Sequence, residues 1–281
     1  MRWSSAVVAV AALSAALFGI FGAQASPGTS AASAATDADG LLPGEVLERV
    51  EFALFDARTV PEGATLTGAA DLATFTANGR WADSALPVQV RYVFATDPKE
   101  LSAFGSLLWS LRRWEAVGGQ KLRASYAGAF ATGPGVTCTE RTRDSVNTVS
   151  FAKLDSKLLG TTCVFFANVP GTQTRRILEF DMELTTDASW SASETTAPSA
   201  FDLPTVVLHE MGHAIGLGHT PVTGAVMQEA LAPGTQFRVP AQDDRDGLIS
   251  LYGDPAAPTV TPMAVPPAPF ATRRLPALAK E

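Results

Sequence analysis

The chain has 281 residues, a mass of 29.4 kDa and a formal net charge of -7 at pH 7. This length is enough to bury a full core in one catalytic domain with flanking segments. The acidic balance argues against nucleic acid as a partner, because binding to a phosphate backbone requires a basic surface.

The N-terminus has the pattern of a secretory signal peptide. After Arg2, an alanine-rich apolar run extends from Ala6 to Phe21, and Gly22-Ala23-Gln24-Ala25 follows it. A short apolar core ending in a small-x-small site predicts cleavage after Ala25. An uncleaved membrane anchor is the alternative, but the run is short and weakly apolar for a membrane span. Removal of residues 1–25 takes away the charge of Arg2 alone, so the net charge goes from -7 to -8. We expect a secreted, soluble monomer without stable membrane insertion.

Residues 26–75 are expected to form an N-terminal extension or prosegment. Residues 26–40 are rich in Ser, Ala, Gly and Thr, which is typical of a flexible lead-in. Within residues 41–75 one strand is predicted, from Val50 to Ala57. A removable prosegment, an added strand and a small docking unit all fit this stretch.

The expected catalytic domain covers residues 76–254. Its first predicted strand has Val88, Val90, Tyr92 and Phe94 in alternation with polar or small residues. A helix start is predicted at Asp97-Pro98-Lys99-Glu100, with Asp97 as N-cap. The helix then follows the apolar series Leu101, Phe104, Leu108 and Leu111, and Gly118-Gly119 ends it.

Three further strands are predicted, at Val146–Phe151, Leu159–Ala167 and Ile177–Leu184. The last one alternates strictly, and Glu179, Asp181 and Glu183 form its acidic face. Such a face is either a solvated sheet surface or a cation site, and we favour the solvated surface.

Two cysteines, Cys138 and Cys163, fit an exported protein with one disulfide. On the chain-entropy model such a bridge stabilises the fold by about 3 kcal/mol. Two free buried thiols are the alternative.

All three histidines of the chain fall within one stretch, HEMGHAIGLGH. His209 and His213 are spaced i, i+4, so on a helix both rings project from one face and can hold a single ion. Glu210 lies one residue round the helix, where its carboxylate can reach a metal-bound water without being a ligand. Gly216 and Gly218 allow a sharp turn that brings His219 back as the third ligand. Three ligands and an adjacent carboxylate are typical of a catalytic zinc site.

The pattern His-Glu-x-x-His-x-x-Gly-x-x-His resembles the signature of the metzincin zinc endopeptidases, whose other hallmark is a downstream methionine turn. Met227 in Gly224-Ala225-Val226-Met227 is placed to be that methionine. The segment from Asp243 to Gly253 is similar to the last helix of the matrixin branch of this family. The resemblance extends over roughly residues 76–254 and is most specific from Asp202 onward.

The resemblance implies the metzincin zincin fold, of the α/β (α+β) class. It would comprise a twisted, mixed, mostly parallel sheet with two long helices, one active-site helix, and a small C-terminal subdomain with the methionine turn and a final helix. Asp202 is predicted to cap the active-site helix, with Pro204 in its first turn and Val206, Val207, Met211 and Ile215 packing it down. Residues 255–281 are rich in proline and are expected to be a disordered tail.

Several neighbouring residues admit two interpretations. Met227 is either an ordinary core residue or, by resemblance, the apolar floor beneath the zinc. Asp243 and Asp244 are either charges in the first turn of a helix or supports of the metal site. Asp181 or Asp187 could bind a structural Ca²⁺ by analogy with matrixins, although no calcium-loop spacing is present.

The composition also separates this chain from animal matrixins. Their second, structural zinc uses extra histidines, and none remains here beyond the catalytic set. Their latency uses a prosegment cysteine, and no cysteine precedes the expected catalytic domain. Inhibition by residues 26–75 would therefore need another group or plain steric cover.

The leading hypothesis is a secreted zinc endopeptidase that hydrolyses internal peptide bonds of proteins. Zinc on His209, His213 and His219 would lower the pKa of a bound water and polarise the scissile carbonyl, with Glu210 as general base. The resemblance places the substrate along an edge strand within Leu159–Ala167, and residues 228–240 as the wall of the specificity pocket. The alternatives are a non-catalytic, zinc-stabilised binding module and a site with Glu229 as third ligand.

Overall fold

The computed structural model describes residues 36–61, 75–98, 103–118, 122–129, 138, 142–172 and 175–253. The predicted signal peptide, residues 26–35 of the lead-in and the proline-rich tail lie outside these residues. The strands are β1 (Val46–Asp56), β2 (Arg80–Trp81), β3 (Val88–Tyr92), β4 (Ala124–Ala129), β5 (Asn147–Ala152), β6 (Leu158–Asn168), β7 (Arg175–Thr185), β8 (Trp190–Ser191), β9 (Phe201–Asp202) and β10 (Ala230–Leu231). The helices are α1 (Ala103–Gly118), α2 (Leu203–Ala214) and α3 (Gln242–Tyr252), with short 3₁₀ turns η1 (Ala57–Thr59), η2 (Asp83–Ala85) and η3 (Phe94–Thr96).

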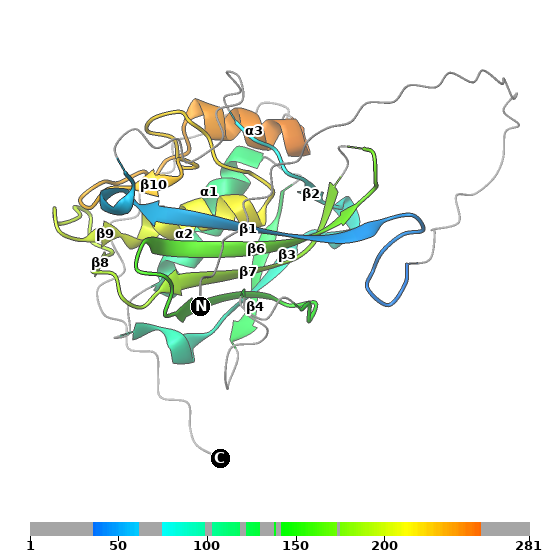
Figure 1. The fold of residues 1–281 in the computed structure, drawn as a ribbon, viewed down its shortest axis with the longest axis horizontal. Coiled ribbons are helices and arrows are strands. Elements are labelled where there is room, and N and C mark those ends of the chain that lie inside the picture. Colours follow the sequence, from blue (N-terminus) through cyan, green and yellow to red (C-terminus); the bar gives the residue numbers. More distant parts are fainter. Residues whose placement is uncertain are drawn as a thin grey trace, which may run out of the picture. The chain divides into compact units, whose positions relative to one another are not determined.

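The main sheet is mixed and mostly parallel, as the resemblance implied. Its strand order is β10-β1-β6-β7-β5-β3-β4, and β2 pairs with one end of β7. Only β6 is antiparallel to its neighbours, which are β1 and β7; the other pairings in this sheet are parallel. In Figure 1, β1 (blue) runs alongside β6 and β7 (green), and α2 (yellow) packs behind them.

The predicted strands are confirmed with small shifts of their ends. The strand predicted at Val50–Ala57 is β1, which begins earlier, at Val46, and ends at Asp56; Ala57 is the first residue of η1. Leu159–Ala167 lies within β6, but it is not an edge of the sheet, because β1 pairs with it antiparallel from Val46 to Phe55. The prediction of an open edge strand was therefore wrong, and the strand that covers β6 comes from the N-terminal extension.

The acidic face of β7 is buried, so the prediction of a solvated surface was also wrong. Glu179, Asp181 and Glu183 are each exposed by 3% or less. The backbone N–H groups of Asp144 and Ser145 donate to the Glu179 carboxylate, which also pairs with Arg143. A segment distant in sequence thus supplies the partners that burial of a carboxylate requires.

Helix α1 packs on α2 through a face that overlaps the predicted one. Leu111 is buried as predicted, and Leu107 and Trp114 are buried as well, whereas Phe104 and Leu108 are only partly buried. The indole N–H of Trp114 donates to the Leu208 carbonyl of α2 at 2.9 Å. Asp97 lies in extended backbone and accepts the Tyr92 hydroxyl, and residues 99–102 of the predicted helix start lie outside the described part.

The two cysteines form a disulfide, as predicted, between Cys138 and Cys163 of β6. Among the described residues, no helix is long and apolar enough to cross a membrane.

Candidate metal centre and active site

The first two histidines, His209 and His213, lie on helix α2. Asp202 caps the helix by accepting the Thr205 N–H at 3.0 Å, and Pro204 stands in the first turn. Each residue from Leu203 to Ala214 is buried, which is unusual for a surface helix and ties α2 to the core on every side. The rings of His209 and His213 project from this fixed scaffold one turn apart.

The chain turns sharply after α2 because Gly216 adopts a φ of +105°, in the region that favours glycine. The N–H groups of Gly216 and Leu217 return to the carbonyls of His213 and Gly212, which closes the helix end. A Cβ on Gly216 would overlap the carbonyl oxygen of Gly79. The turn brings His219 back toward α2, as the spacing predicted.

The three imidazoles converge on one point. The Nε2 atom of His213 lies 3.0 Å from Nε2 of His209 and 3.2 Å from Nε2 of His219. Nδ1 of His209 faces the Val226 carbonyl at 2.7 Å, and Nδ1 of His213 faces the Leu217 carbonyl at 2.8 Å. A carbonyl can only accept, so Nδ1 of both rings carries the proton and Nε2 presents a lone pair.

Electrostatics keep these rings neutral. Burial lowers the pKa of His209 to about 4, and it lowers the pKa of His213 and His219 well below the ordinary value. Neighbouring histidines add to the effect on His213. Neutral rings whose lone pairs converge within a few ångströms are a donor set that suits Zn²⁺, which prefers nitrogen ligands in a compact geometry. Among the described residues these three histidines form the one group of His, Cys, Asp or Glu close enough to hold a metal.

Glu210 lies beside the histidines and is fully buried. Its Oε2 accepts a 2.6 Å hydrogen bond from the Thr162 hydroxyl of β6. Its Oε1 is buried and makes no hydrogen bond. Burial raises the pKa of Glu210 to about 8, while the Thr162 and Leu54 groups act to lower it. A dication held by the histidines would also lower this pKa, since opposite charge favours the carboxylate.

The methionine turn lies under the histidines. Met227 is 2% exposed, and a Cβ on Gly212 of α2 would overlap its sulfur, so close packing of Met227 requires glycine there. The Asp244 carboxylate of α3 accepts the N–H groups of Val226 and Met227 at 2.9 and 3.0 Å. The same carboxylate accepts the Ala241 N–H at the start of α3 at 2.7 Å. Asp244 therefore both caps its helix and holds the turn whose Val226 carbonyl orients His209. Asp243 makes no contact with the turn that the structure shows.

Glu229 is not placed as a third ligand. Its Oε1 lies 3.7 Å from Nδ1 of His219, on the far side of that ring from the converging Nε2 atoms. Asp187 is exposed, whereas Asp181 is buried and accepts the Thr148 hydroxyl. Burial raises the pKa of Asp181 to about 8. The neutral acid is thereby favoured, and a calcium site stays a prediction.

Sequence reasoning missed the contacts that β1 and β6 make with the site. Phe52 of β1 stacks on His213, with ring centroids 4.3 Å apart. Gly160 of β6 lies against Glu210, and a Cβ there would stand 2.6 Å from Oε1. Alternation along β6 puts Gly160 and Thr162 on one face, but it does not say which helix that face meets.

Comparisons with known proteins agree with this geometry. A family model described as Matrixin matches residues 161–253, which include the three histidines, Glu210 and Met227. Metalloendoproteinase 1 of Glycine max is 42% identical over 74 residues, which are 26% of this chain and 24% of that protein. Matrix metalloproteinase-25 of Mus musculus is 38% identical over 77 residues, 26% of this chain and 12% of that protein. Metalloendoproteinase 5-MMP of Arabidopsis thaliana is 44% identical over 52 residues, 18% of this chain and 14% of that protein.

The chain thus spans a quarter or less of the length of these three relatives. The matched segment carries the His-Glu-x-x-His helix, the glycine turn with the third histidine, and the methionine turn in one arrangement. The part of this chain that holds the three histidines is therefore similar to the matrixin family in both its sequence and the arrangement of its site.

Proposed function

We propose that the chain is a secreted, zinc-dependent endopeptidase that hydrolyses internal peptide bonds of proteins. The observation that carries the proposal is the convergence of three neutral imidazole nitrogens beside the buried carboxylate of Glu210. Metal retention alone does not need that carboxylate, which burial in the core makes costly to ionise. Its presence favours a catalytic site over a non-catalytic, zinc-stabilised binding module.

His209, His213 and His219 would hold the zinc, and the matrixin family implies this metal. When bound, zinc supplies a Lewis acid that polarises a carbonyl and lowers the pKa of water. Glu210 accepts a proton from the attacking water and returns it to the nitrogen of the leaving amine. Thr162 holds Oε2 of Glu210, and this leaves Oε1 to carry the proton. Such proton transfer contributes about 10² to 10⁴ in rate.

The disulfide between Cys138 and Cys163 and the predicted signal peptide support secretion, because disulfides persist in oxidising compartments. The names of the three relatives support the class of reaction.

The proposal is tested with the purified chain, a Glu210→Ala variant and, as a matched control, Glu194→Ala, which removes an exposed carboxylate away from the site. Bound zinc is measured, and each protein is incubated with a mixed peptide library, with and without a chelator. We expect one zinc per chain, cleavage by wild type and Glu194→Ala, and loss of cleavage by at least 100-fold in Glu210→Ala. The protease assignment would be contradicted by a chain that binds zinc but shows no Glu210-dependent cleavage even when strand β1 is displaced from the site.

A further inference from the structure

Strand β1 lies in a slot between β6 and β10. It pairs antiparallel with β6 and parallel with β10, where Phe55 is opposite Ala230 and Asp56 is opposite Leu231. The Phe55 N–H donates to the Glu229 carbonyl at 3.0 Å, and the Asp56 N–H donates to the Lys157 carbonyl at 2.8 Å. Neighbouring strands lie about 4.8 Å apart, so β6 and β10 are separated here by the width of one extended chain, about 10 Å. β1 is the chain that fills this space.

The same strand lies directly over the candidate catalytic groups. The Phe52 ring is stacked on His213 and meets His219 edge-on, at centroid distances of 4.3 and 6.3 Å. Two residues later, Leu54 is 2% exposed and belongs to the apolar core. Leu54 is opposite Gly160 in the register of β1 against β6, and Gly160 lies against Glu210, where a Cβ would stand 2.6 Å from Oε1. The Ala53–Leu54 peptide therefore lies next to the proposed general base.

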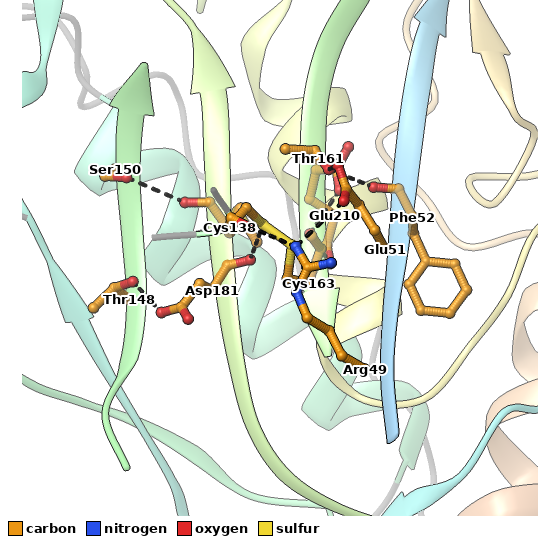
Figure 2. The surroundings of a disulfide bond; sticks show 12 residues. Arg49, Glu51, Phe52, Cys138, Thr148, Ser150, Thr161, Cys163, Asp181 and Glu210 are labelled. Atoms are coloured by element: carbon orange, nitrogen blue, oxygen red, sulfur yellow. Dashed lines mark hydrogen bonds and ion pairs between the residues drawn. A yellow bond between two sulfur atoms is a disulfide. The ribbon is translucent and has the colours of Figure 1, made fainter. Parts of the chain in front are cut away.

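The other half of β1 is held by polar contacts away from the metal centre. Glu48 pairs with Arg175 of β7 at 2.8 Å, and Arg49 donates to Cys163 of the disulfide at 2.8 Å. Figure 2 shows Arg49 reaching from β1 across to the disulfide, and Glu210 behind the strands. In addition, the Thr161 hydroxyl donates to the Phe52 carbonyl at 2.8 Å. These contacts fix one register of β1 against β6.

We propose, on the basis of the function proposed above, that residues 46–56 are an internal peptide occupant of the substrate cleft. This segment binds as a peptide substrate would, by strand addition to β6, with the Ala53–Leu54 bond next to Glu210 and the side chain of Leu54 buried in the apolar core. A separate peptide and β1 require the same backbone partners on β6 and β10. The segment therefore competes with other peptides, so that the wild-type chain cleaves them at a reduced rate, and no cysteine ligand is needed for this.

The test measures binding, so that it does not depend on catalysis. A fluorescent peptide with the sequence of residues 46–56 is titrated into the zinc-loaded full chain in a Glu210→Ala background, and its anisotropy is followed. Adding Leu54→Asp places a charge at this buried position, which disfavours binding of β1 beside the site. We expect the peptide to bind at least 10-fold more tightly to this double variant than to Glu210→Ala alone. The matched control is Leu47→Asp, at a position of the same strand that is 44% exposed, and it should leave the affinity unchanged.

Phe52→Ala, which only removes the ring over His213, provides a milder second variant and should shift the affinity in the same direction. The inference would be overturned if folded, zinc-loaded chains with and without these substitutions bound the peptide with equal affinity. If Leu54→Asp does not fold, the affinity of Phe52→Ala tests the inference. In a chain with Glu210 intact, Leu54→Asp should also raise peptide cleavage at least 10-fold. Tighter peptide binding with no cleavage by any variant supports the occupant and refutes the protease. If the chain cleaves peptides, but Leu54→Asp changes neither the cleavage rate nor the peptide affinity, the result refutes the occupant and supports the protease.

Discussion

The hydroxyl of Thr162 donates a 2.6 Å hydrogen bond to Oε2 of Glu210, and this bond joins strand β6 to the candidate general base on α2. Both residues are fully buried. The bond fixes one carboxylate oxygen and acts to lower the pKa of Glu210, opposite to the effect of burial. Thr162 is thus a positioning residue for the proposed reaction.

Thr162→Val keeps the shape of the side chain and removes the donor. We expect kcat to fall about 10-fold with little change in KM, because orientation of Glu210 is lost and binding of the peptide is not. Loss of the hydrogen bond raises the pKa of Glu210, and the reaction needs the carboxylate, so the acidic limb of the pH–rate profile should move to higher pH. Thr162→Ser keeps the hydroxyl donor and should therefore retain both the wild-type kcat and the wild-type position of the acidic limb of the pH–rate profile. A Thr162→Val profile that coincides with wild type would refute this role.

Gly216→Ala combines backbone strain with a steric clash. Its φ of +105° disfavours alanine, and the new Cβ would overlap the Gly79 carbonyl oxygen. We expect a loss of about 2 to 4 kcal/mol in the free energy of unfolding, together with weaker zinc binding because His219 shifts. Gly224→Ala is the control: its φ is +86°, and no atom lies within 4 Å of its Cβ. Strain alone costs about 1 to 2 kcal/mol there. Urea unfolding and zinc titration of both variants check the difference.

Asp181 makes stability depend on pH. Burial raises its folded pKa to about 8 from an ordinary value of 3.8, so the folded chain binds a proton that the unfolded chain releases. The resulting stabilisation is fully present below about pH 4 and is lost as pH rises toward 8. In Asp181→Asn this pH-dependent stabilisation is absent. The decrease in the free energy of unfolding between pH 5 and pH 8 should therefore be smaller than in wild type, by about 2 to 4 kcal/mol. Asp187→Asn, at an exposed position, should retain the wild-type dependence. Unfolding curves in urea at each pH measure both, and parallel wild-type and Asp181→Asn profiles would count against the assignment.

Leu54 indicates which peptides the cleft accepts. Its side chain is buried in the apolar core, so substrates that replace β1 should carry a large aliphatic residue immediately after the cleaved bond. Mass spectrometry of library peptides cut by the Leu54→Asp chain would report this position. We expect leucine there to be preferred over aspartate by at least 10-fold, since one buried aliphatic side chain is worth about 1.5 to 3 kcal/mol. Equal use of both residues would contradict the placement of Leu54.

Local patterns determined most of the metal centre. The i, i+4 spacing of His209 and His213, the Asp202 cap and the glycine at position 216 each act within one or two helical turns, so their geometry follows from neighbouring residues. The disulfide also agrees with the prediction, since only two cysteines are present. The strands were found for a similar reason, because alternation is a local property of the chain.

Only the tertiary structure decided what surrounds that centre. The pairing of β1 with β6, which removes the expected edge strand, joins segments more than 100 residues apart and has no local signal. The acidic residues of β7 alternate as a solvated face would, yet the segment around Asp144 covers Glu179 and supplies its hydrogen bonds. Alternation reports that a strand has two faces; which element covers each face depends on sheet order and register, and these are set by non-local packing.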